Sequence, residues 1–173
     1  WPAGVVQGIY REVADVGLYS ISAPATTLTA APTLAANALA VGSCIRITAR
    51  GHYRDNIGWS GFEFIVKLGS TNIATASILI EAPVPDTTNR PFVLEALLTC
   101  RTTGGSGSVM GQYTATFVHG SVGGTFSGHG GSVTSAGTVD TTVSNVLDVL
   151  FNVGNNDADV GITVTNALIE YIK

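Results

Sequence analysis

Residues 62–80, FEFIVKLGSTNIATASILI, hold the pattern that decides the fold class. In residues 62–69 large apolar side chains occupy every second position, and Glu63 and Lys67 lie between them. Successive side chains of a β-strand point to opposite faces, so this alternation predicts a strand with one buried face. The link Gly69–Thr71 is short enough for a hairpin, and residues 72–80 follow as the partner strand. The stretch therefore predicts an antiparallel β-hairpin.

Similar short apolar runs between glycine-rich turns continue along the chain, and no window shows a well-capped helical period. The best helix candidate, Thr33–Gly42, follows Pro32 and ends in glycine, so it would give at most a turn or two. Residues 121–137 are rich in glycine and poor in apolar side chains, which predicts a long exposed loop. The other expected strands are residues 17–21, 43–54, 90–102, 107–120, 141–153 and 160–172.

About eight strands in 173 residues predict a single all-β domain spanning residues 1–173, with residues 1–16 as a candidate N-terminal arm. The expected architecture is an antiparallel β-sandwich of jelly-roll type, because eight strands in two packed sheets solve the edge problem in this way. An immunoglobulin-type sandwich is the alternative. Trp59 does lie between Cys44 and Cys100, as that framework requires, but the polar residues around it predict a loop.

Charge is scarce in this sequence. Charged residues make up 12% of the chain, about half the usual share, and the formal net charge is −4. A nucleic-acid partner is therefore not expected, because a phosphate-binding groove needs clustered positive charge. No apolar run reaches the length of a membrane span, so no membrane insertion is expected. A surface of Ser, Thr, Asn and Gly repels copies of itself weakly and suits subunits that pack together.

No catalytic residue, metal site or cofactor is predicted. The three histidines, His52, His119 and His129, lack the spacing of metal ligands. The acidic run at residues 155–159 lacks the spacing of a calcium loop and is expected to be a turn. Cys44 and Cys100 match no metal motif; two free thiols are expected, with one disulfide as the alternative.

One candidate ligand-binding cluster precedes the central hairpin. It consists of Tyr53, Asp55, Asn56 and Trp59, which place two aromatic rings beside an acid and an amide. A loop-borne tryptophan with such neighbours can hold a glycan. The alternative is that Trp59 covers one end of the sandwich.

Four stretches together resemble a widespread family of phage and environmental-virus virion proteins. They are TTLTAAPTLAANALAVGSCIRITARG (26–51), VKLGSTNIATASI (66–78), LLTCRTTGGSGSVMGQ (97–112), and the tail with DTTVSNVLDV and NDADVGITVTNALIEYI. Their order and spacing carry the resemblance, which covers residues 17–173. Two departures are TLAAN where relatives tend to have TLPAN, and the glycine-rich residues 121–137. The first puts the conformation of that turn in question, and the second is a candidate tip loop for a receptor.

The resemblance implies a jelly-roll domain of a virion surface or tail component, such as a capsid decoration protein, a head fibre or a tail fibre. Such domains commonly form homotrimers, so the implied partners are copies of the chain and other virion proteins, with a host-surface glycan as a further partner. The implied location is the virion. The family offers no catalytic residues to carry over.

Threonine-rich, charge-poor strands can pack against copies without burying ions. We therefore expect a subunit interface on the second faces of the last two strands. The residues expected there are Thr142, Ser144, Thr163, Thr165 and Tyr171.

The sequence thus favours a non-enzymatic virion protein that acts by self-assembly and host attachment. The alternative is a carbohydrate-binding module or lectin-like adhesin domain. A jelly-roll enzyme comes third, because no acid–base pair or metal spacing is present.

Overall fold

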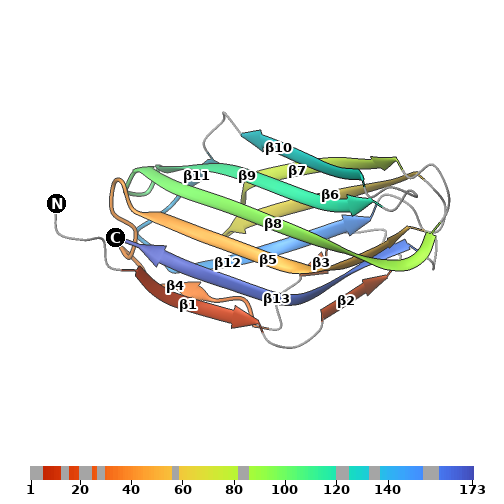
Figure 1. Ribbon diagram of the computed structural model, residues 1–173. Helices are drawn as coiled ribbons and strands as arrows, with labels where there is room; N and C mark the ends of the chain where they lie inside the picture. The colour runs from red at the N-terminus through yellow and green to blue at the C-terminus, as the bar shows by residue number, and fades with distance from the viewer. Residues whose placement is uncertain are drawn as a thin grey trace.

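The computed structural model describes residues 6–12, 16–19, 25–26, 30–55, 59–81, 86–119, 125–132, 137–153 and 160–173. All regular secondary structure in these ranges is β-strand (Figure 1). The strands are β1 (Val6–Glu12), β2 (Val16–Tyr19), β3 (Ala25–Thr26), β4 (Thr33–Leu34), β5 (Cys44–Asp55), β6 (Trp59–Leu68), β7 (Thr71–Glu81), β8 (Asp86–Thr102), β9 (Gly107–His119), β10 (Thr125–Ser132), β11 (Gly137–Val139), β12 (Asn145–Val153) and β13 (Val160–Ile172). No described residue belongs to a helix that could cross a membrane.

The strands form two antiparallel sheets that face each other. The large sheet has the order β1-β13-β5-β8-β9-β10, with β2 beside β13 and β11 beside β9. The small sheet has the order β3-β12-β6-β7, with β4 beside β12. If β1, β4, β5, β6, β7, β8, β12 and β13 are counted from one to eight, these strands follow the orders 1-8-3-6 and 2-7-4-5, and β9 and β10 extend the large sheet beyond β8. This is jelly-roll connectivity, which confirms the predicted fold class.

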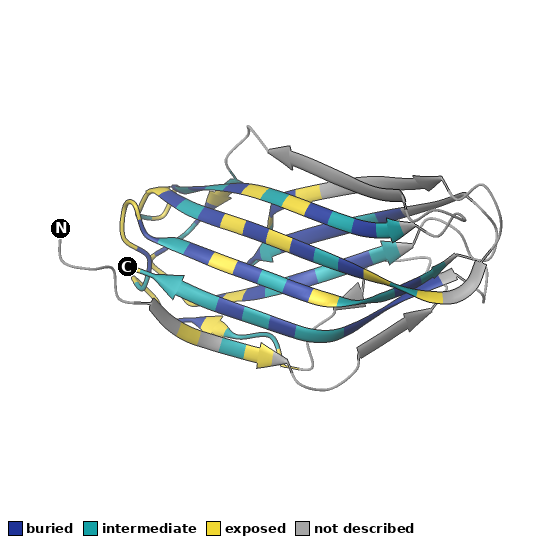
Figure 2. Ribbon diagram, viewed as in Figure 1, coloured by how far each residue is buried: buried dark blue, intermediate teal, exposed yellow. Residues whose placement is uncertain are grey.

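The core lies between the sheets and is rich in aromatic rings. Buried and exposed residues alternate along the central strands, as Figure 2 shows for β5 and β8. Phe117 of β9 lies within 6.0 Å, between ring centroids, of Tyr53, Phe62, Phe64 and Phe92. Truncating one such phenylalanine to alanine typically costs about 3–5 kcal/mol, so this cluster is a major source of stability.

The central hairpin is confirmed. Strands β6 and β7 pair along their length, and Leu68 and Thr71 close a two-residue turn. Gly69 has a φ of 62°, and a positive φ at the first central position characterises type II′ hairpin turns. Its backbone N–H also donates to the Val146 carbonyl at 2.8 Å, which ties the turn to β12.

The last strand differs from its predicted alternation. Ile162 and Val164 face the core as expected, but the pairing with β5 shifts between Val164 and Asn166. Such a bulge inserts one residue and reverses which side chains point inward. Ala167 and Ile169 are therefore buried, whereas the sequence pattern places Leu168 and Ile172 inward.

Several predicted boundaries also change. Strand β12 begins at Asn145, four residues after the predicted start. Strand β6 begins at Trp59, so that residue is in a strand and not in the predicted loop. The expected loop at 121–137 contains β10, which pairs with β9, and the expected N-terminal arm contains β1, which pairs with β13. Residues 33–42 form β4 and turns without a helix.

Candidate functional site

The end of the sandwich near the C-terminus is built from loops that hydrogen-bond to one another (Figure 1). We call it the loop end; it comprises residues 35–43, 69–70, 102–107 and 140–146. Asn37 donates its backbone N–H to the Thr141 carbonyl at 2.8 Å, and Thr141 donates to the Gly104 carbonyl at 3.0 Å. Asn37 has a φ of 59°, a left-handed conformation that asparagine tolerates, so the TLAAN turn forms without a proline.

Residues 140–145 form a tightly bonded turn within the loop end. The Asp140 carboxylate accepts hydrogen bonds from the Thr142 hydroxyl at 2.6 Å and the Thr142 N–H at 2.9 Å. These two bonds lower the pKa of Asp140 below its ordinary value, the hydroxyl bond most. The Asn145 side-chain amide donates to the carbonyls of Asp140 and Val143. The backbone of this turn is therefore held by side chains on both sides.

These ordered loops expose apolar side chains. Val41 is 67% exposed, Val143 is 49% exposed and Val146 is 45% exposed. Single exposed valines are normal on protein surfaces. Here Val41 and Val143 lie on loops that hydrogen-bond to one another, and Val146 lies near the start of β12, so all three belong to the loop end.

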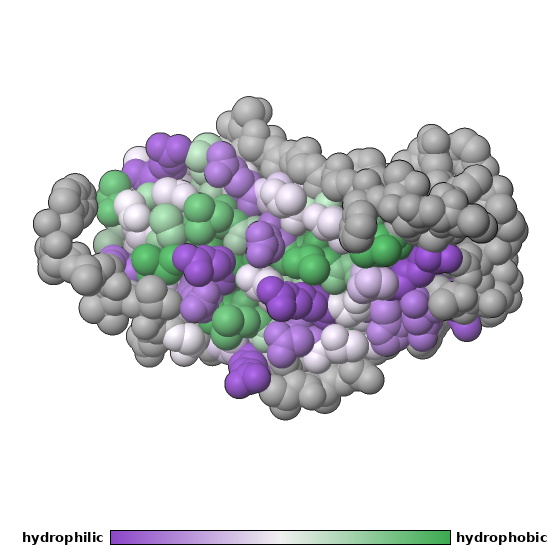
Figure 3. Space-filling view, in the orientation of Figure 1, coloured by the Kyte–Doolittle hydropathy of each residue, from purple (hydrophilic) through white to green (hydrophobic). Residues whose placement is uncertain are grey.

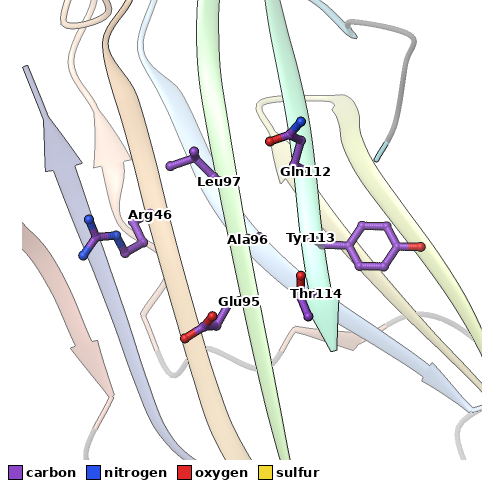
Figure 4. A pocket seen from close by; sticks show the side chains of 7 residues that line it. All are labelled: Arg46, Glu95, Ala96, Leu97, Gln112, Tyr113 and Thr114. Atoms are coloured by element: carbon purple, nitrogen blue, oxygen red, sulfur yellow. The ribbon is translucent and has the colours of Figure 1, made fainter. Parts of the chain in front are cut away.

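A second surface lies on the outer face of the large sheet, where hydrophobic and hydrophilic side chains are interspersed (Figure 3). Here β8 and β9 place Leu97 opposite Gln112, Ala96 opposite Tyr113, and Glu95 opposite Thr114. The pairs Leu97–Gln112 and Glu95–Thr114 border an open hollow of about 490 Å³, which Arg46 of β5 also lines. Figure 4 shows Glu95 and Leu97 leaning from β8 toward β5, away from Gln112 and Thr114 on β9. We call this space the β8–β9 hollow.

Charge around the hollow is partly matched. Arg46 lies 3.3 Å from the Glu170 carboxylate, in a pair whose arginine side chain is 53% exposed. An exposed pair of this kind is worth little in stability, but it neutralises the arginine charge locally. Glu95 has no hydrogen-bond or ion-pair partner among the described residues.

Within the described ranges, no group of three His, Cys, Asp or Glu side chains is placed to hold a metal ion. Cys44 and Cys100 are both free thiols, as the sequence led us to expect. Cys44 is half-buried beside Thr99, and its Sγ atom lies 3.6 Å from the threonine hydroxyl. Cys100 belongs to the core between the sheets, and burial raises the pKa of its thiol.

Among the four residues of the predicted glycan cluster, the structure describes the side chain of Tyr53 alone, so the cluster as a whole stays a prediction. Tyr53 is 2% exposed, packs edge-on against Phe62 and Phe117, and donates its hydroxyl to the Val118 carbonyl at 2.9 Å. Its ring therefore belongs to the core. Asp55 ends β5 and Trp59 begins β6. Asn56 lies outside the described residues, as do the whole acidic run at 155–159 and parts of the candidate tip loop at 121–137.

The predicted interface residues divide into two groups. Thr142 and Ser144 are exposed in the turn before β12 and flank Val143. On β13, Thr163 is 5% exposed and Thr165 donates its hydroxyl to the Arg50 carbonyl at 3.2 Å. Tyr171 packs against the core and donates to the Ala38 carbonyl at 2.6 Å, so the bulge has turned it away from the face predicted for it.

The hollow was not predicted, although one signal for it exists in the sequence. Leu97 lies on the polar parity of β8, between Glu95 and Thr99, and a leucine there is out of pattern. The pairing of β8 with β9, which completes the hollow, is visible only in the structure.

No protein-family model and no curated protein matches this sequence. Among solved structures, the chain is similar to one titled "Structure of the CBM2 module of Lactobacillus casei BL23 phage J-1 evolved Dit". The two are 9% identical, the match covers 98% of this chain and 97% of that chain, and the TM-score is 0.43. This is a likeness to a phage module at low similarity; the fold described above stands on the strand order alone.

Proposed function

We propose that the chain is a non-enzymatic structural protein of a bacteriophage virion, in the class of capsid decoration, head fibre and tail fibre components. It assembles as a homotrimer, contacts other virion proteins and attaches to the host surface. Residues 1–173 act as one domain. The sequence resemblance over residues 17–173 supports this function, and the jelly-roll strand order is the fold that the resemblance implies.

The observation that carries the proposal is the set of exposed valines on the loop end. Full burial of a side chain of this size contributes about 1.5–3 kcal/mol, and roughly half of that remains to be gained at Val143 and Val146. The hydrogen bonds of Asp140 and Asn145 fix the turn in advance, so association loses little backbone entropy. Thr142 and Ser144 add hydroxyl groups that can bond to a second copy without the cost of burying ions.

Native mass spectrometry of the whole chain at low micromolar concentration tests this assembly. We expect a trimer near three times 17.8 kDa. Replacing both Val143 and Val146 by lysine puts like charges into the proposed interface and should give monomers. The matched control is Thr75→Lys on β7, an exposed position outside the loop end, which should leave the trimer intact.

A monomer in the unchanged protein would contradict the proposal. A trimer that survives both valine substitutions would contradict the loop end as the interface. Circular dichroism of each variant verifies that the fold is retained.

The second candidate function is that of a carbohydrate-binding module. The β8–β9 hollow favours it, because Leu97 offers an apolar side chain there and Arg46, Glu95, Gln112 and Thr114 offer polar ones.

A further inference from the structure

We propose that the β8–β9 hollow binds a neutral sugar residue of a host-surface glycan. The inference rests on the attachment part of the proposed function and not on assembly, since the hollow lies on the sheet face and outside the loop end.

The hollow lies between two residue pairs of strands β8 and β9 on the outer face of the large sheet. Leu97 and Gln112 form one wall and Glu95 and Thr114 the other, separated by two residues along each strand, or about 7 Å. Its volume of about 490 Å³ falls in the range of small-molecule sites. The inward-facing Ala96 lies between the walls, so no side chain on β8 fills the space.

The side chains around the hollow supply the groups that a sugar needs. Glu95 accepts two hydrogen bonds, Gln112 both donates and accepts, and Thr114 does both with one hydroxyl. None of the three has a side-chain hydrogen bond to another described residue. Leu97, 36% exposed, offers an apolar surface for the C–H groups of a sugar ring.

Charge selects a neutral ligand. Glu170 balances Arg46, which leaves the Glu95 carboxylate as the unmatched charge at the hollow. A second carboxylate or a phosphate would meet this charge directly, and like charges at close range repel. Sialic acids, uronic acids and phosphate-bearing polymers are therefore expected to bind poorly.

The strands hold the site in place. Strands β8 and β9 pair continuously from Phe92 to Cys100, and both are flanked by further strands of the large sheet. Sites built on strands keep their geometry better than sites on loops. Tyr113 also lines the hollow, but it lies opposite the buried Ala96 and packs against the core. With few contacts to a sugar, we expect dissociation constants on the order of millimolar for a single site, and several copies on one particle would raise the overall avidity.

The test is a two-dimensional amide NMR titration of the whole chain with methyl glycosides of glucose, galactose, mannose and N-acetylglucosamine. N-acetylneuraminic acid is the acidic comparison. At least one neutral glycoside should shift the amide signals of residues 95–97 and 112–114 in a saturable way, and N-acetylneuraminic acid should not shift them.

Variants then assign the effect. Glu95→Ala should weaken binding about tenfold, because a charged acceptor is lost, and Thr114→Val should weaken it less. Thr75→Val is the matched control on the other sheet and should bind as the unchanged chain does. The folded state of each variant is verified by its amide spectrum.

The proposal is overturned if no neutral glycoside shifts these amides, if shifts persist unchanged in Glu95→Ala, or if they map instead to residues 53–59. The oligomeric state measured on the same samples separates the two proposals. A trimer without sugar binding would refute the hollow alone, whereas a monomer that binds the sugar would refute the assembly alone.

Discussion

Substitutions at Tyr53 test whether this residue belongs to the core or to a ligand-binding site. Tyr53→Phe keeps the ring that packs against Phe62 and Phe117, with centroid distances of 5.8 and 5.1 Å, and removes only the hydroxyl that bonds to Val118. A net hydrogen bond of this kind is worth about 1 kcal/mol. Tyr53→Ala also removes the ring and should cost about 3–5 kcal/mol, because both edge-to-face contacts are lost and a cavity remains.

Thermal unfolding followed by circular dichroism, at one fixed protein concentration, measures both changes. In a domain of this size 1 kcal/mol corresponds to about 2–4 °C, so Tyr53→Phe should lower the Tm by that amount and Tyr53→Ala several times further. Tyr53 is buried and does not line the β8–β9 hollow, so Tyr53→Phe should leave a sugar titration of the hollow unchanged. A Tyr53→Phe variant of unaltered stability that no longer binds sugar would refute the reasoning.

Two further perturbations test the strand packing and the loop end. Gly51→Ala places a methyl group against the Thr163 carbonyl oxygen and 2.9 Å from a Phe92 ring carbon, so it should lower the free energy of unfolding in urea by about 3 kcal/mol or more. Gly105→Ala, where no atom lies within 4 Å, should lower it by less than about 0.5 kcal/mol. Equal losses in the two variants would contradict the packing around Gly51. Thr142→Val removes the main cause of the lowered pKa of Asp140, so an NMR titration should show that pKa rising toward the ordinary 3.8. A carboxyl group whose pKa is lowered in the folded state stabilises the protein at pH values above its unfolded-state pKa. This stabilisation is lost as the pH falls through the folded-state pKa. The Thr142→Val variant should therefore lose less stability on acidification than the unchanged chain. An unchanged Asp140 pKa would refute the assigned hydrogen bonds.

The sequence predicted the fold class well because the core strands keep strict alternation. Phe62, Phe64, Val66 and Leu68 all face the core, and the turn at Gly69 lies where the hairpin was expected. The residues that were misplaced lie where alternation is weak. Residues 125–132 form β10 although glycine is common there, because hydrogen bonds to β9 do not depend on side chains. Thr142 and Ser144 belong to a turn because Asp140 and Asn145 bond to the local backbone, which competes with strand pairing.

Surfaces were harder to predict than the core, and β13 shows why. Sequence alternation assigns Thr163, Thr165 and Tyr171 to one face, but a single inserted residue near Asn166 reverses every assignment that follows it. Next to the bulge the two strands approach closely: Gly51 of β5 lies so near the Thr163 carbonyl that no side chain fits between them. The hollow depends in the same way on the register between β8 and β9, which places Glu95 beside Thr114. Burial can be predicted without knowing the strand register, because a large apolar side chain by itself indicates a core position. A binding surface needs specific neighbours from different strands, so its prediction requires the register. Turn geometry brings the residues of the loop end together, and strand pairing does the same for the β8–β9 hollow. Sequence alternation alone therefore predicts neither surface.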